Sequence, residues 1–420
     1  MIDLHGNTIG GESLPARSGA TFELLAAPDG SGALPRSMGA YPRSGAPDVE
    51  AALAAARSAE GAWWALGIPA RREILARAAR DLAADPDPGG RLALRLGLSR
   101  EELAPHLRPL PELLARALED PAAIFPDGRI AERGLLLLAP AWGELAAGPA
   151  SALFAALALG RTALAVSDPV APSIPDAFAG ALLRAGLQPG VLGVLHDDGE
   201  DALRAALGSS LPTYVLASGF PERVRRLERM AGRTGGASFG AGVRIVPGTA
   251  IDLRTLHSSS QVVDESEDLA QRAVEIADAA FGRSCALSGQ LPGQVGRVSV
   301  HRRVFSRFTE ELLAALRKSD DLDRPVPIVD RESEEELRRA RVLGLDEGAT
   351  LIFDGRAYES AGKEAALPEG SSPDDPDEAI LAPSVFTNVE ERMRLASLVR
   401  PTSILCLLRG GHARGRESRD

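Results

Sequence analysis

The chain has 420 residues, 45% of them hydrophobic and 25% charged, which is enough to bury a sizeable core and form two or three domains. Its net charge is −11 with scattered basic residues, which argues against nucleic acid as a partner. Two cysteines cannot form a disulfide framework, no signal segment opens the sequence, and the longest apolar stretch, Leu145 to Leu159, is too short to span a membrane. We therefore expect a cytoplasmic protein with no nucleic-acid partner and no membrane contact.

Strand and helix patterns alternate between Gly134 and Leu216. The expected strands are 134–139, 160–166, 191–195 and 213–216, and the expected helices are 149–159, 175–185 and 201–207. Alternation at this spacing predicts right-handed crossovers and a mostly parallel sheet. Ligands of such sheets bind beyond the carboxyl ends of the strands. We therefore expect the loops 139–142, 166–169 and 217–220 to lie on one edge.

A second α/β unit is expected from residue 262. Its predicted helices are 266–280, 304–316 and 333–343, and its predicted strands are 298–300 and 350–353. The acidic run 264–268 suits the start of a helix. The polar, proline-rich stretch 371–377 predicts a surface loop, and the polar tail 409–420 is predicted to be disordered.

Cys285 lies in a turn of small residues between an expected helix and an expected strand. A nucleophilic thiolate has to be reachable and tunable, and such a turn can present one. On its own, a single cysteine also fits the interpretation of a small buried hydrophobic residue.

Cys285 and its flanks look like the catalytic-cysteine segment of the aldehyde dehydrogenase superfamily. Other segments resemble that family in collinear order: 18–24, 46–57, 64–79, 185–194, 382–385 and 393–396. The resemblance covers about residues 3–408. It implies an aldehyde-dehydrogenase-like α/β fold, with N-terminal helices and a Rossmann-type dinucleotide-binding domain in residues 1–261. It also implies an α/β catalytic domain in residues 262–408 that carries the nucleophilic cysteine and begins the return to the cofactor domain.

The resemblance also implies the chemistry. The Cys285 thiolate would attack a small aldehyde or acyl substrate, and hydride would pass from the thiohemiacetal to NAD or NADP, leaving a thioester. Ser218 is similar to the serine of the family's cofactor-cradling loop and is the expected cofactor-binding residue. No metal is implied. Relative to the family the chain is shortened at its C-terminus, which leaves the oligomeric state open.

Several positions depart from the family pattern. The oxyanion-holding asparagine has no counterpart in 140–145, and the cofactor-gripping lysine falls on Val166. The general-base segment corresponds to 238–242 or to 255–259, and neither contains a glutamate. The second cofactor glutamate is absent from 397–401.

Each remaining candidate has a functional and a structural interpretation. His257 could replace the missing base, or be a solvated loop residue. Glu144 is the acid nearest the oxyanion loop, but a solvated carboxylate at a helix start is expected. The glycine-rich stretch Gly232 to Gly242 could cradle a phosphate, yet a flexible loop is expected, and Cys406 is expected in the core.

Three functions follow from these observations. The first is NAD(P)-dependent oxidation of an aldehyde through Cys285. The second is a non-hydrolytic acyl-CoA or acyl-phosphate reductase, because the missing base would then be tolerated. The third is a catalytically degenerate family member that acts as a binding or structural subunit.

Overall fold

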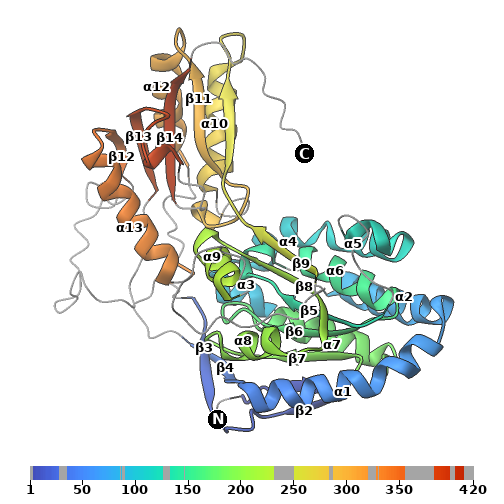
Figure 1. Cartoon of the computed structure of the whole chain (residues 1–420). Coiled ribbons are helices and arrows are strands. Elements are labelled where there is room, and N and C mark those ends of the chain that lie inside the picture. The colour runs from blue at the N-terminus through green and yellow to red at the C-terminus, as the bar shows by residue number, and fades with distance from the viewer. Residues whose placement is uncertain are drawn as a thin grey trace. The chain divides into compact units, whose positions relative to one another are not determined.

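The computed structural model describes residues 3–27, 36–85, 87, 90–125, 133–145, 147–230, 250–282, 287–319, 328–329, 331–354, 383–397 and 403–410. The chain divides into two compact units, the first ending at Thr255 and the second starting at Leu256 (Figure 1). None of the helices within these ranges has the length and hydrophobicity needed to cross a bilayer.

Unit 1 contains most of the described helices. Its elements are β1 (Asn7–Ile9), β2 (Glu12–Leu14), β3 (Thr21–Leu25), β4 (Ser37–Pro42), α1 (Ala46–Ala65), α2 (Ile68–Ala84), α3 (Arg91–Leu96), α4 (Arg100–Leu107), α5 (Leu110–Glu119), η2 (Pro121–Ile124), β5 (Leu135–Ala139), η4 (Trp142–Glu144), α6 (Ala147–Ala158), β6 (Thr162–Val166), α7 (Ser173–Arg184), β7 (Leu192–Leu195), α8 (Asp201–Gly208), β8 (Pro212–Gly219), α9 (Pro221–Met230) and β9 (Ala250–Thr255).

Unit 1 is built around a seven-stranded sheet of order β2-β1-β7-β6-β5-β8-β9. The strands β7, β6, β5 and β8 are parallel, as predicted. The strand β9, which the sequence analysis did not predict, adds parallel to β8, and β1 adds antiparallel to β7. The chain proceeds from β5 through β6 to β7 on one side and then from β8 to β9 on the other. The strand order therefore reverses between β5 and β8, and this is the point at which such sheets bind ligands.

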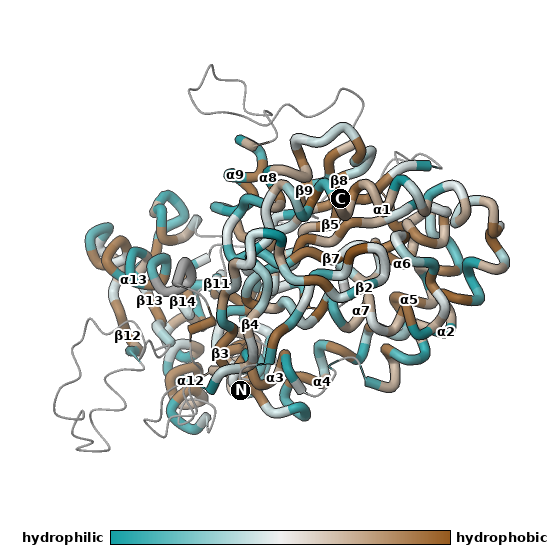
Figure 2. Tube along the Cα trace, turned by 90° about the horizontal axis from the view of Figure 1, so that it is seen from below, coloured by the Kyte–Doolittle hydropathy of each residue, from teal (hydrophilic) through white to brown (hydrophobic). Residues whose placement is uncertain are grey.

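Helices cover both faces of this sheet. One face packs against α1, α8 and α9, which form a single apolar cluster with β5, β6 and β8. The other face packs against α6 and α7, with α2 and α5 outside them (Figure 1). All five residues of β5 are buried because the strand is covered on both sides, and the strands labelled β5 and β7 are among the hydrophobic parts of Figure 2.

Unit 2 is a smaller α/β layer structure. Its elements are β10 (Ser259–Val263), α10 (Leu269–Phe281), η5 (Leu287–Gly289), β11 (Val295–His301), α12 (Phe305–Arg317), α13 (Arg331–Asp346), β12 (Thr350–Asp354), β13 (Ser384–Val389), η7 (Leu395–Ser397) and β14 (Ile404–Gly410).

The sheet of unit 2 has the order β10-β11-β14-β13-β12, with only β12 antiparallel to its neighbour. The helices α10 and α12 share one apolar cluster with this sheet, and α13 shares another. Cys406 lies in β14 and is 3% exposed, so its predicted place in the core is confirmed. The α/β fold expected from the sequence is confirmed in both units.

Candidate functional site

The loops that follow β5, β6 and β8 meet at the carboxyl edge of the parallel strands, as the sequence predicts. Ala139 at the end of β5 pairs with Ala217 of β8, and Ser218 pairs with Arg254 of β9. We call this region the switch-point edge and define it as residues 140–145, 167–170, 218–223 and 252–255. It lies wholly within unit 1.

An ion pair ties three strand ends together at the switch-point edge. Arg223, in the first turn of α9, places its Nη1 2.5 Å from Oδ2 of Asp168, which follows β6. The same oxygen accepts a hydrogen bond from the backbone N–H of Trp142 at 3.1 Å, and Oδ1 accepts one from Val170 N–H at 2.9 Å. Nη2 of Arg223 also reaches the carbonyl oxygen of Pro140 at 3.5 Å. Loops after β5 and β6 and the helix after β8 are thus joined through two side chains.

Glu144 makes a second contact across the same edge. The Ser218 hydroxyl donates to its Oε2 at 2.5 Å, and the backbone N–H of Ala141 donates to the Ser218 hydroxyl at 2.9 Å. Burial raises the pKa of Glu144, an effect opposed by the Ser218 hydrogen bond and by Arg254 and Arg223. Glu144 is thus half-buried and engaged with Ser218, which differs from the solvated carboxylate that the sequence predicts. The short helix η4 turns Glu144 toward β8, where Ser218 holds it.

Neutralising Glu144 tests this burial. Because the pKa of its carboxyl is raised in the folded state above its ordinary value of 4.5, stability falls as pH rises from there through the folded pKa. Glu144→Gln keeps an acceptor for Ser218 and carries no charge, so we expect it to melt about 1–3 °C higher than the wild type at neutral pH. The difference should vanish below pH 4.5.

Calorimetric scans over a range of pH values measure this effect. Glu73→Gln on α2 is the matched control, because the Glu73 side chain is 75% exposed. A Glu144→Gln variant that is no more stable than the wild type at neutral pH would contradict the assignment.

Ser218, the predicted cofactor-binding residue, lies at the switch-point edge but is fully buried, and its hydroxyl is engaged with Ala141 and Glu144. Its cofactor role stays a prediction.

The sequence analysis did not predict the ion pair formed by Asp168 and Arg223. The sequence signal that could have found this pair is an aspartate just after a buried strand, Asp168 after β6, together with an arginine in the first turn of a helix that follows another strand, Arg223 in α9 after β8.

A buried serine, a buried histidine and a partly exposed aspartate form a row of contacts that begins at this edge with Ser167. The Ser167 hydroxyl is 3.0 Å from Nδ1 of His196, whose Nε2 is 3.0 Å from Oδ1 of Asp176. These are the residue types of a hydrolytic triad. Ser167 is only 4% exposed and His196 is fully buried, so the arrangement ties β6, β7 and α7 together and presents no nucleophile at the surface.

Cys285 lies outside the described residues, as do the glycine-rich stretch 232–242 and residues 398–401. The described chain resumes at Leu287, and there Leu287, Ser288 and Gly289 all have positive φ angles (48°, 52° and 93°). Leu287 and Ser288 are buried. Two consecutive non-glycine residues in the left-handed region are a strained turn, and strain of this kind gathers at functional sites.

The segment 255–259, one of the two considered for the general base, begins at the last residue of β9 and ends at the first residue of β10. His257 is exposed, and its Nδ1 is 3.1 Å from the carbonyl oxygen of Ser258. This agrees with a solvated loop residue.

Among the described residues, no group of three or more His, Cys, Asp or Glu side chains is arranged to hold a metal ion.

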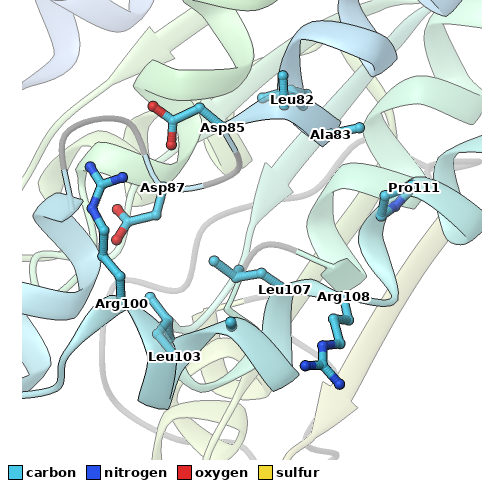
Figure 3. A pocket seen from close by; sticks show the side chains of 11 residues that line it. Leu82, Ala83, Asp85, Asp87, Arg100, Leu103, Leu107, Arg108 and Pro111 are labelled. Carbon is cyan, nitrogen blue, oxygen red and sulfur yellow. The ribbon is translucent and has the colours of Figure 1, made fainter.

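A separate pocket of about 400 Å³ lies among the N-terminal helices (Figure 3). Its wall is formed by the end of α2, by α4 and by the start of α5, and contains Leu82, Leu103 and Leu107. Asp87, also in the wall, accepts hydrogen bonds from the backbone N–H groups of Leu92 and Ala93. The pocket contains none of the residues that the sequence singled out as functional.

Three comparisons relate the chain to known proteins. The family model of the aldehyde dehydrogenase family matches residues 134–398, more than half of the chain. Succinate-semialdehyde dehydrogenase [NADP(+)] GabD of Escherichia coli (strain K12) is 26% identical over 378 residues, which cover 84% of this chain and 73% of that protein.

Solved structures agree with the family match. A 3,6-anhydro-L-galactose dehydrogenase in complex with NAP is 18% identical, with a TM-score of 0.78, covering 98% of this chain and 83% of its own. An indole-3-acetaldehyde dehydrogenase in complex with NAD+ is 20% identical, with a TM-score of 0.74 and coverage of 98% and 81%. These likenesses confirm the expected fold. With the family match over residues 134–398, they lead to one conclusion: the chain belongs to the aldehyde dehydrogenase family.

Proposed function

We propose that the chain is an NAD(P)-dependent oxidoreductase that oxidises an aldehyde through a thiohemiacetal and then a thioester on Cys285. The observation that carries the proposal is the strand order β7-β6-β5-β8-β9, which reverses between β5 and β8. A doubly wound parallel sheet binds dinucleotides beyond this point. Membership of the aldehyde dehydrogenase family supplies the reaction class.

In this proposal unit 1 holds the cofactor and unit 2 carries the nucleophile. The Cys285 thiolate forms a bond to the aldehyde carbon, and the hydride that leaves this carbon reduces NAD(P)+ to NAD(P)H. The strained turn at Leu287 and Ser288 supports the assignment of Cys285, because it directly follows the segment that contains the thiol.

NAD or NADP is supported as cofactor by the relatives, whose names include NADP(+), NAP and NAD+. We place the dinucleotide at the switch-point edge, where Arg223 lies. A Cβ atom on Gly219 would lie 2.8 Å from three carbons of Arg223, so this side chain runs directly over the backbone at the end of β8. In this proposal a dinucleotide that approaches the end of β8 meets the Arg223 side chain.

Release of the thioester to coenzyme A or phosphate is the second candidate. Each carboxylate described at the switch-point edge is engaged: Glu144 with Ser218, Asp168 with Arg223, Glu222 with Arg225, and Asp252 with Arg254 at 3.0 Å. A general base must be free to take a proton from water. This favours an acyl acceptor that needs less activation than water does.

The test supplies the purified chain with aliphatic and aromatic aldehydes and either NAD or NADP. Parallel arms contain no acceptor, coenzyme A or inorganic phosphate. NAD(P)H formation without an acceptor supports hydrolytic release, and formation that requires coenzyme A or phosphate supports the second candidate. No NAD(P)H in any arm contradicts both and leaves the degenerate family member.

A further inference from the structure

The ion pair between Arg223 and Asp168 occupies the place where a dinucleotide is expected. It joins the helix after β8 to the loop after β6, across the end of β5. The pair is largely shielded from water, with the side chains of Arg223 and Asp168 19% and 8% exposed. Shielding strengthens the attraction between the two charges.

We infer that Arg223 exchanges Asp168 for a phosphate group of the dinucleotide, so that the ion pair is a latch that opens when the cofactor binds. The inference rests on the proposed function. Arg223 lies in the first turn of α9, and phosphates bind where helix N-termini meet the switch point of such a sheet. A guanidinium group bonds carboxylate and phosphate with the same forked geometry, so one ligand can replace the other.

Asp168 is built to survive this exchange. Its Oδ2 keeps the hydrogen bond from Trp142 N–H, and its Oδ1 keeps the one from Val170 N–H, after Arg223 has left. The Asp168 carboxylate therefore keeps two hydrogen-bond donors when the ion pair opens. Without them, a buried charge with no partner would make opening too costly in free energy.

The pair between Arg184 and Asp81 lies away from the switch-point edge. It joins α7 to α2, with Nε of Arg184 3.3 Å from Oδ2 of Asp81. It is a matched control, because it is an Asp–Arg pair of unit 1 outside the region where a dinucleotide is expected.

A latch lowers the apparent affinity for the cofactor by the fraction of molecules in which it is open. Removing the Asp168 charge should raise that fraction. We expect Asp168→Asn and Asp168→Ser to bind NADPH or NADH roughly tenfold more tightly than the wild type, for an open fraction on the order of 10%. Arg223→Ala should bind roughly tenfold more weakly, because a charge-assisted hydrogen bond to phosphate is lost.

Fluorescence titration of NADPH and NADH against the wild type, these variants and Asp81→Asn measures the dissociation constants. Thermal melting verifies that each variant is folded. If either Asp168→Asn or Asp168→Ser fails to fold, the other variant still tests the latch. Asp81→Asn should match the wild type.

The outcomes separate the latch from the proposed function. Wild-type binding with no gain in the Asp168 variants overturns the latch and leaves the function standing. Tighter binding by Arg223→Ala also overturns the latch, since Arg223 would then only obstruct the site. No binding by the wild type or by any variant overturns the latch and the proposed function together.

Discussion

Cys285→Ala is expected to abolish aldehyde-dependent NAD(P)H formation while leaving the dissociation constant for the dinucleotide unchanged. The thiolate is the group that forms the covalent bond to the aldehyde carbon, and alanine offers no nucleophile in its place. Loss of a nucleophile in covalent catalysis costs on the order of 10⁴-fold or more in rate. Initial rates of NAD(P)H formation and a binding titration on the same preparation measure the two quantities separately.

The chain's other cysteine is the matched control. Cys406 is buried in β14, and burial raises the pKa of its thiol to about 12, so it stays protonated and unreactive. Cys406→Ala should retain activity. Activity that persists in Cys285→Ala, or disappears only in Cys406→Ala, would show that Cys285 is not the nucleophile.

Leu137→Ala is expected to cause a large loss of stability in unit 1. Leu137 is in the middle of β5 with no exposed surface, and it pairs in register with Leu164 of β6 and Val215 of β8. Truncation leaves a cavity between two covered faces of the sheet, which costs about 2–5 kcal/mol in the free energy of unfolding.

Tryptophan fluorescence during denaturation with urea isolates this effect. The chain's three tryptophans, Trp63, Trp64 and Trp142, all lie in unit 1, so the signal reports that unit. Leu94→Ala is the control, because Leu94 is 44% exposed, and it should change the free energy of unfolding by less than about 1 kcal/mol. Equal losses in the two variants would contradict the placement of β5 at the centre of the core.

The parallel strands of unit 1 could be predicted because their signal is local. A strand covered on both faces is apolar throughout, as in Leu135 to Leu138 of β5. A glycine marks the end of a helix between two strands, as Gly186 does after α7 and before β7. Right-handed crossovers then place the following loops on one edge without further information.

The contacts at that edge could not be predicted, because they depend on residues far apart in the chain. Asp168 and Arg223 are 55 positions apart, and Glu144 and Ser218 are 74 apart. The sequence presents Glu144 only as an acid near a helix start, and its burial follows from where β8 ends. The pairing of β1 with β7 has the same origin, since a three-residue strand has little periodicity of its own.

Amide hydrogen exchange of the wild-type chain with and without NAD(P)H tests the dinucleotide site most directly. We expect slower exchange in the segments 141–145, 167–170 and 220–224, where the ends of β5, β6 and β8 meet. Unchanged exchange in these segments, or protection confined to 82–87 and 100–111 around the pocket of Figure 3, would contradict a dinucleotide site at the switch-point edge.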